Sequence, residues 1–297
     1  MLPEFQREYV WELEQAKQLI VSLFRDYPTG SLLFWKTSDP PDIKNNAVNP
    51  DRIGTTSVIL DGQQRLTTLY LFTQSEIPPY YTEDDIKNDP RNLYFDLESG
   101  DFQYYQASKM EKNPRWVSVT DCLTRKDINP FSIAQACIDD EPQHFSLAQS
   151  LNDNLNRLRN IREKEYPIQT VPSTATIDDA IDVFDRVNSL GTKLTEAELA
   201  LAHICGKWPQ ARRVMKDQIE KYSAERFYFD LTFMVRSLTA VVKGRALVET
   251  IHGESRERLE QGWKKLVRIL DYLTAVLPKH AYNHCDNPSH LSPLRST

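Results

Sequence analysis

No apolar run in the sequence approaches the roughly 20 residues that a membrane-spanning helix needs. Residues 1–4 do not begin a signal peptide. The four cysteines, Cys122, Cys137, Cys205 and Cys285, lie far apart and form no CxxC pair, which argues against a disulfide framework and a zinc ribbon. We therefore expect reduced thiols, no membrane association and a cytoplasmic location.

Several familiar site signatures are also missing. The sequence has no Walker A loop, no GxGxxG, no HExxH, no serine nucleophile elbow and no internal repeat. Four potential metal ligands lie near the end of the chain, at His280, His284, Cys285 and His290, but their spacing fits no strong ligand template. An unpatterned tail is the simpler interpretation of residues 278–297.

The charge is acidic overall but uneven along the chain. The 297 residues carry a formal net charge of −6, which argues against a generic coat for nucleic acid. Residues 205–268, in contrast, contain 14 Lys and Arg but 8 Asp and Glu. This excess is either an ordinary solvated helix surface or a basic face that contacts nucleic acid.

The hydrophobic pattern predicts an α+β fold with a small mixed α/β core at residues 1–110 and a mainly helical region, packed on it, at 111–297. The core should contain strands at 31–36 and 57–60, a hairpin from 93–98 and 102–105, and a polar inserted loop at 37–56. Its first helix carries an apolar stripe made of Ala16, Leu19, Ile20, Leu23 and Phe24. Later helices are expected near 145–165, 177–187, 209–222, 229–251 and 255–277, with a short strand at 166–171.

The most informative stretch is residues 57–69, which predict a buried strand, a tight turn at Asp61 and Gly62, and then a helix. In that helix, apolar-periodic spacing places Leu66, Leu69, Tyr70 and Thr73 on one face. The turn aims backbone N–H groups and the positive end of the helix dipole at one point, which suits a phosphate.

The side chains of this turn extend the same chemistry. Arg65 adds a fork of donors, Gly62 allows close backbone approach, and Asp61 could hold a metal ion or take a proton. Gln63 and Gln64 could orient a water molecule or a ribose. The alternative is a β-turn with a helix cap, in which Asp61 caps and Arg65 is solvated.

Two further blocks surround this turn in the sequence. Residues 3–11, PEFQREYVW, place the polar pair Gln6 and Arg7 among aromatic anchors, so that Arg7 could reach a phosphate. Residues 184–195, FDRVNSLGTKLT, end one helix and begin another, whose cap is Thr195 with Glu198 three residues later. On its own, this second block describes an ordinary corner between helices.

Together and in this order, the three blocks resemble the N-terminal domain of the GmrSD type, and the resemblance covers essentially the whole chain. It implies a ParB/sulfiredoxin-like core joined to a helical region. It also implies that the DGQQR turn binds and hydrolyses a nucleoside triphosphate. The family serves bacterial anti-phage restriction systems that sense modified DNA, so DNA and a nuclease domain or subunit are the expected partners, and an oligomer is compatible with this role.

The resemblance implies a nucleotide site by position. Its residues are Gln6, Arg7, Asp61, Gly62, Gln63, Gln64, Arg65, Thr67, Asn188 and Gly191. Asp61 would hold Mg²⁺ or position the attacking water, which Gln63 or Gln64 would align, and Arg65 with Arg7 would neutralise the phosphates. Asp61, Gln63, Gln64 and Arg65 are thus the catalytic candidates.

Two departures from the family pattern shape the expectation. Only four residues precede Phe5, and no HNH-type nuclease signature follows the third block. We expect a truncated chain or a standalone regulatory domain that is not itself an HNH endonuclease. Two alternatives to hydrolysis remain: a non-catalytic DNA- or partner-recognition module regulated by nucleotide, and a ParB-like nuclease, for which the sequence offers no convincing metal cluster.

Overall fold

The computed structural model of the chain describes residues 1–44, 54–188, 195–251 and 253–277. Contacts divide the chain into two compact units that alternate along the sequence. The first unit consists of Met1–Arg7, Trp35–Asp61 and Val171–Thr297, and the second of Glu8–Phe34 and Gly62–Thr170. The domain boundary expected at residue 110 stays a prediction.

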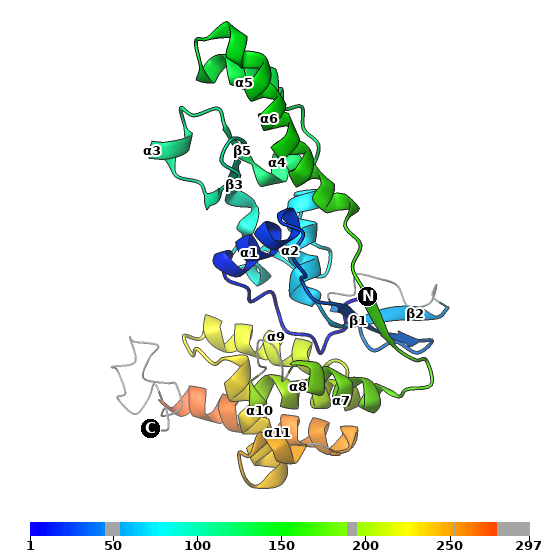
Figure 1. The fold of residues 1–297 in the computed structure, drawn as a ribbon. Helices are drawn as coiled ribbons and strands as arrows, with labels where there is room; N and C mark the ends of the chain where they lie inside the picture. Colours follow the sequence, from blue (N-terminus) through cyan, green and yellow to red (C-terminus); the bar gives the residue numbers. More distant parts are fainter. Residues whose placement is uncertain (45–53, 189–194, 252, 278–297) are drawn as a thin grey trace. The chain divides into compact units, whose positions relative to one another are not determined.

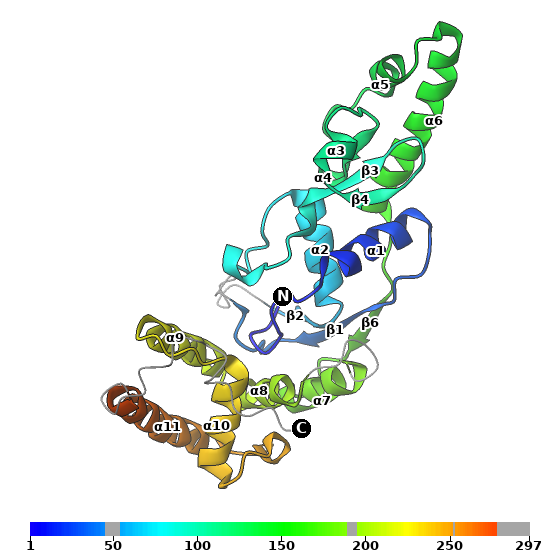
Figure 2. The same cartoon turned by 90° about the vertical axis from the view of Figure 1, so that its left-hand side faces the viewer.

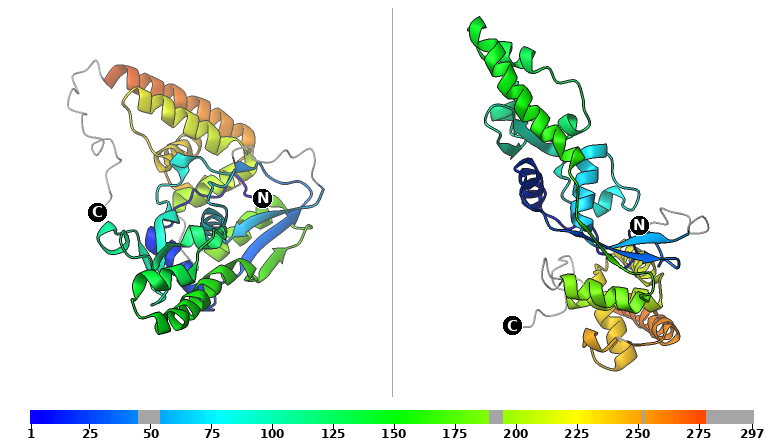
Figure 3. Two further views of the ribbon diagram at one scale, coloured as in Figure 1. Left: turned by 90° about the horizontal axis from the view of Figure 1, so that it is seen from above. Right: turned by 45° about the vertical axis from the view of Figure 1, so that its right-hand side comes forward.

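The second unit combines six helices with a small antiparallel sheet among its described residues. The helices are α1 (Leu13–Phe24), α2 (Gln63–Gln74), α3 (Ala107–Met110), α4 (Val119–Leu123), α5 (Pro130–Cys137) and α6 (Glu141–Arg159). Strands β3 (Leu93–Asp96), β4 (Phe102–Tyr104) and β5 (Trp116–Ser118) pair in the order β4-β3-β5. Helix α5 lies alongside the long helix α6 (Figures 1 and 3).

The core of this unit forms where α1, α6 and the sheet meet. All five residues of the predicted stripe of α1 are buried. Phe24 makes edge contacts with Phe95 and Phe102, with ring centroids 5.1 and 5.4 Å apart. Leu151 and Leu155 of α6 are fully buried in the same cluster. Burial of this apolar surface is the main force that holds α1 and the hairpin in place.

The first unit is mainly helical. It contains α7 (Ile177–Asn188), α8 (Glu196–Lys207), α9 (Ala211–Ala224), α10 (Leu231–Lys243) and α11 (Arg256–Val276), which gather together in Figure 2. Thr195 and Glu198 cap α8 reciprocally, as the sequence predicts. Helix α7 packs against strand β2 (Thr56–Asp61) of the same unit.

A second sheet has the strand order β2-β1-β6, with β1 at Leu32–Thr37 and β6 at Ile168–Val171. The chain leaves the second unit within β1, after Phe34. Single-turn 3₁₀ helices occur at Glu83–Asp85, Pro90–Asn92, Asn160–Glu163 and Val248–Ile251. The predicted fold class, a mixed α/β core followed by a mainly helical region, is confirmed.

The residues of α2 expected on one face, at 66, 69, 70 and 73, share a half-buried side, and a largely polar side next to it is buried. The helix buries Gln63, Gln64, Thr67, Thr68, Leu71 and Phe72, whereas the residues at 66, 69, 70 and 73 are only half-buried. The polar side chains of the buried side find hydrogen-bond partners inside the unit, which removes the cost of burying them.

Several expectations fall outside the described residues. These are residues 45–53 of the predicted loop, residues 189–194 of the interhelical turn, and the tail at 278–297 with its histidines. No helix in the described part of the chain combines the length and apolar character required to cross a membrane.

Candidate functional site

The central turn forms as predicted, where strand β2 ends and helix α2 begins. Val58, Ile59 and Leu60 are buried, and Asp61 ends the strand. Gly62 is the N-cap of α2, so this end has no side-chain cap, and the first turn carries no acidic residue. The positive end of the helix dipole at this turn is therefore not offset by an acidic residue within the first turn of α2, and such a helix start favours an anion.

Glycine is required at position 62 for two reasons. Its φ of 95° lies in the left-handed region, which side chains with a Cβ rarely adopt. A Cβ there would also lie 2.3 Å from Cδ2 of Leu32 and 3.2 Å from Nη2 of Arg65. Because position 62 has no side chain, the turn can bring the start of α2 close to the start of β1.

Arg65 holds the backbone that leads into β1. Its Nη1 donates to the carbonyl oxygen of Thr29 at 2.7 Å, and its Nη2 donates to that of Ser31 at 2.8 Å. The guanidinium also lies against Gly30, where a Cβ would approach Nη1 to 2.4 Å. Arg65 thus fixes the entry to β1 while keeping a positive charge within the first turn of α2.

Gln64 fastens the segment after Arg7 onto α2. Its Oε1 accepts from the backbone N–H groups of Val10 at 2.9 Å and Trp11 at 3.3 Å, and its Nε2 donates to the carbonyl of Glu8 at 2.9 Å. The side chain is buried. Both polar atoms of the carboxamide therefore bind backbone, which gives Gln64 a structural role, and its role in aligning water stays a prediction.

Tyr9 strengthens the same connection. Its hydroxyl shares a 2.9 Å hydrogen bond with the hydroxyl of Thr68, which in turn donates to the carbonyl of Gln64. Burial raises the pKa of Tyr9 to about 12, so the phenol stays protonated at neutral pH. Neither Tyr9 nor Thr68 was predicted as part of the site. The sequence signal for Tyr9 was only its place among the aromatic anchors of residues 3–11.

Gln63 and Thr67 meet at the hydroxyl of Tyr81. Gln63 Nε2 donates to this hydroxyl, and the Thr67 side chain is hydrogen-bonded to it as well. Burial raises the pKa of Tyr81 well above its ordinary value, so this partner also stays neutral. Thr67 faces the interior of the second unit, so its predicted contact with nucleotide stays a prediction.

In the first unit, Gln6 and Phe5 connect the opening block to the rest. Gln6 is 3% exposed and its Nε2 donates to the carbonyls of Ile59 at 3.2 Å and Leu60 at 2.9 Å. Phe5 packs edge-on against Phe184 with ring centroids 5.6 Å apart. The first block therefore contacts both β2, next to Asp61, and the helix that carries the third block.

Four further residues were predicted for the site: Arg7, Asp61, Asn188 and Gly191. Arg7 and Asp61 are half-buried in the first unit. Asn188 is the last residue of α7, and Gly191 lies outside the described residues. In the described ranges no group of three or more His, Cys, Asp or Glu could hold a metal ion. Mg²⁺ often needs only one or two protein carboxylates, because nucleotide phosphates supply other ligands.

Several basic residues of 205–268 form ion pairs. The carboxylate of Glu254 forms ion pairs with Lys243 and Arg258 near the start of α11, and Lys221 forms an ion pair with Asp271. Lys264, Lys265 and Arg268 are exposed along α11 and form a short basic stripe. This stripe is the part of the excess that best fits a contact with nucleic acid.

Comparison with known proteins gives two findings. The family described as GmrSD restriction endonuclease, N-terminal domain, matches residues 1–205 of this chain. The uncharacterized protein MJ0686 of Methanocaldococcus jannaschii is 24% identical over 311 aligned residues, covering 91% of this chain and 51% of that protein. The chain thus spans about half the length of the curated relative that it matches.

Proposed function

Because this chain belongs to the GmrSD restriction endonuclease N-terminal domain family, we propose that it is the nucleoside triphosphate-binding and -hydrolysing module of a modification-dependent anti-phage restriction system. One observation carries the proposal. The α2 N-terminus has a glycine cap, no acidic residue in its first turn, the carboxylate of Asp61 just before it, and the guanidinium of Arg65 just inside it.

These groups have distinct roles in the proposed reaction. The N–H groups at the start of α2 bind phosphate oxygens, and the charges of Arg65 and Arg7 favour the negative charge of the transferred phosphoryl group. Asp61 binds Mg²⁺ or positions the attacking water. Hydrolysis by this route depends on positioning and charge stabilisation, so the rigid attachment of the turn matters for the rate.

The rigid attachment comes from the other residues of the motif. Gln64 and Arg65 bind backbone at residues 8–11 and 29–31, and Gln6 binds the carbonyls at the end of β2. An Arg65→Ala variant would therefore lose both a charge and a structural contact, and its inactivity alone would not identify a phosphate ligand. Asp61→Asn is the sharper change because it removes one charge and keeps the shape.

The test is phosphate release from each of the four ribonucleoside triphosphates with Mg²⁺. The wild-type chain is compared with Asp61→Asn and with Asp101→Asn, an exposed aspartate in the turn of the β3–β4 hairpin. We expect turnover that Asp61→Asn lowers by about 100-fold or more and Asp101→Asn leaves unchanged. Equal turnover in both variants, or none in the folded wild-type chain with or without DNA, contradicts the proposal.

A second candidate function is recognition of DNA or of a partner subunit without hydrolysis, with nucleotide as a regulatory ligand. The basic stripe of α11 favours it, because adjacent exposed cations at helical spacing can contact successive phosphates. Binding of duplex DNA that weakens steeply with salt, and that the triple change of Lys264, Lys265 and Arg268 to Gln removes, would support this candidate. Unchanged DNA binding in the triple variant would exclude the basic stripe as the DNA-binding surface. In either case we infer that DNA and a nuclease domain or subunit are the partners.

A further inference from the structure

A group of stacked aromatic side chains lies on the surface of the first unit, where helix α9 ends and helix α10 begins. Phe229 stacks on Phe227 and on Phe233, with ring centroids 6.3 and 4.6 Å apart and interplanar angles of 19° and 10°. Each of the three rings is only half-buried, and Tyr228 in the same segment is 54% exposed. Contiguous apolar surface that stays in contact with water is typical of a binding site.

The segment that carries these rings is fixed at both ends. The N–H of Phe227 donates to the carbonyl of Tyr222 in the last turn of α9, at 2.9 Å. At the other end, Asp230 caps α10 by accepting from the N–H of Phe233 at 2.6 Å. The rings are therefore held in their stacked arrangement before any ligand binds, which lowers the entropic cost of binding.

Arg226 occupies an unusual backbone position between α9 and these rings. Its φ of 67° lies in the left-handed region, and its N–H donates to the carbonyl of Ser223 at 3.0 Å. Helices that end in this way usually have glycine at this position, because a side chain there is strained. An exposed arginine in this conformation, directly before Phe227, favours a role for its side chain outside the fold.

A single buried side chain joins the rings to the basic stripe of α11. Tyr222 packs edge-on against Phe229 with centroids 5.4 Å apart, and its hydroxyl donates to Asp271 Oδ1 at 3.0 Å. Arg268 precedes Asp271 by three residues and follows Lys264 by four, so the three side chains are neighbours on the surface of α11. The aromatic surface and the basic stripe thus adjoin through Tyr222.

The charge of this part of the first unit favours an anionic partner. Residues 205–268 contain 14 Lys and Arg but 8 Asp and Glu. Two carboxylates near the rings are already engaged, since Asp230 caps α10 and Asp271 forms an ion pair with Lys221 at 2.9 Å. Glu225 is exposed beside Arg226 and offsets part of its charge. The exposed cations of the basic stripe remain available to an anion.

We propose that this surface binds unpaired nucleobases of a nucleic-acid strand, which stack on Phe227, Phe229 and Phe233. The phosphates of the same strand contact Arg226 and the basic stripe of α11. Aromatic rings beside cations suit this ligand, because every base has a flat face that stacks and the backbone is anionic. A duplex covers its base faces in its own stack, so the ligand is a single strand or a base extruded from a duplex. The inference goes beyond nucleotide hydrolysis and does not depend on it.

The test measures binding by fluorescence anisotropy at low salt, without nucleoside triphosphate. The probes are a labelled oligothymidylate of about 12 nucleotides and an abasic strand of the same length. Phe227→Leu and Phe233→Leu keep an apolar side chain but remove the ring. We expect each to weaken binding of the oligothymidylate about 5-fold or more and to leave binding of the abasic strand unchanged, because that strand has no bases to stack.

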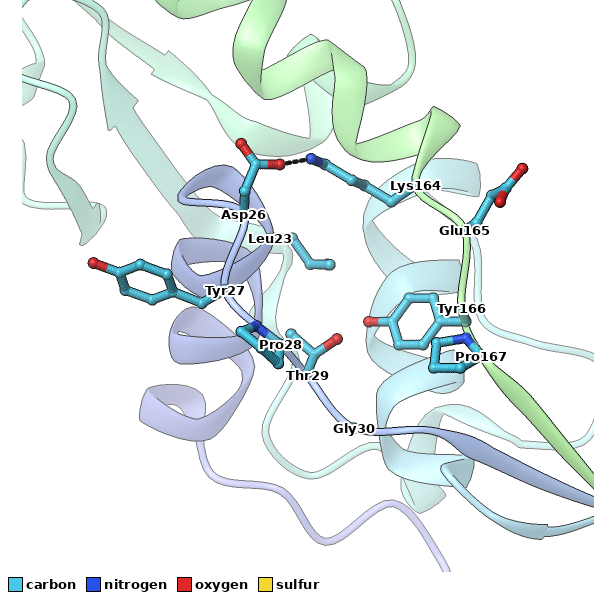
Figure 4. A pocket seen from close by; sticks show the side chains of 10 residues that line it. All are labelled: Leu23, Asp26, Tyr27, Pro28, Thr29, Gly30, Lys164, Glu165, Tyr166 and Pro167. Atoms are coloured by element: carbon cyan, nitrogen blue, oxygen red, sulfur yellow. Dashed lines mark hydrogen bonds and ion pairs between the residues drawn. The ribbon is translucent and has the colours of Figure 1, made fainter.

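A third variant separates binding from folding. Arg226→Gly should weaken binding of both strands, because it removes a phosphate contact, and should not lower the melting temperature, because glycine adopts the left-handed conformation without strain. It keeps the test informative if a ring substitution unfolds the unit. The control is Tyr27→Leu, at a tyrosine of the second unit that is 58% exposed and follows α1 (Figure 4). It should leave the binding of both strands unchanged.

Several results would overturn the proposal. They are unchanged affinity for oligothymidylate in both phenylalanine variants, equal binding of the abasic strand by the wild-type chain, and no binding of oligothymidylate to the folded wild-type chain. A polyglutamate peptide that bound as tightly as the oligothymidylate would also overturn it, by assigning the surface to an acidic protein. Duplex DNA with a single-base bulge distinguishes the two supporting cases. Tight binding of the bulged duplex identifies an extruded base, and binding of the single strand alone identifies a free strand.

Discussion

The attachment of Gln64 to residues 8–11 leads to a prediction that separates its structural role from a catalytic one. Gln64→Ala removes a side chain that accepts from two backbone N–H groups and donates to one carbonyl. Each lost hydrogen bond contributes about 1 kcal/mol, and a buried group left without a partner costs more. We expect the free energy of unfolding of the second unit to fall by roughly 2–4 kcal/mol.

Amide hydrogen exchange gives the local readout for this prediction. In the wild-type chain the N–H groups of Val10 and Trp11 are held by Gln64, so both should exchange slowly. In Gln64→Ala both should exchange at rates approaching those of an unstructured peptide, while the helical amides of α6 keep their protection. The matched control is Gln74→Ala on the same helix, because Gln74 is exposed. Its unfolding free energy should change by less than about 0.5 kcal/mol.

The result that would refute this reasoning is also specific. If Gln64→Ala keeps slow exchange at residues 10 and 11 and unchanged stability, the carboxamide does not hold this segment. If stability is unchanged but nucleotide hydrolysis is lost, Gln64 acts in the chemistry as the family resemblance implies. Loss of both would show that the attachment of this segment is needed for the site to form.

Three further predictions concern single features of the fold. Gly62→Ala should lower stability to urea by about 2–4 kcal/mol, because of its left-handed φ and the 2.3 Å approach to Leu32, whereas Gly54→Ala, with nothing within 4 Å, should be nearly neutral. Raising the pH should destabilise the second unit, because Tyr9 keeps its proton when folded up to a pKa of about 12 but loses it near 10.0 when unfolded. The contribution of Tyr9 to the free energy of unfolding is complete below pH 10 and declines by about 1.4 kcal/mol per pH unit toward pH 12. Urea titration at successive pH values measures this decline. Thr195→Ala should cost about 1 kcal/mol through loss of the cap of α8, and Thr195→Ser should retain most of it in the same assay.

The sequence was a good guide wherever burial follows a simple period. The stripe of α1, the hairpin around Gly100, and the cap of α8 at Thr195 all follow from local patterns, and all are present. The turn at Gly62 was predictable for the same reason, since strand, glycine and helix are adjacent in the chain.

The contacts of the polar residues were not predictable in this way. Gln64 and Arg65 bind backbone groups that lie 34 to 56 positions away, and Gln6 binds carbonyls 53 and 54 positions away. No local period records such partners, so the burial of the polar side of α2 could not be read from the sequence.

The alternation of the two units has a consequence for synthesis on the ribosome. Strand β2 belongs to the first unit, yet the helices that complete this unit begin only after Val171. The second unit, in contrast, has all of its segments once Thr170 has emerged. We therefore expect the second unit to fold first, with residues 35–61 tethered as an unfinished loop within it until the C-terminal helices arrive. A nascent chain arrested shortly after Thr170 would then carry the start of α2 in place but lack the helical support of β2 and Asp61.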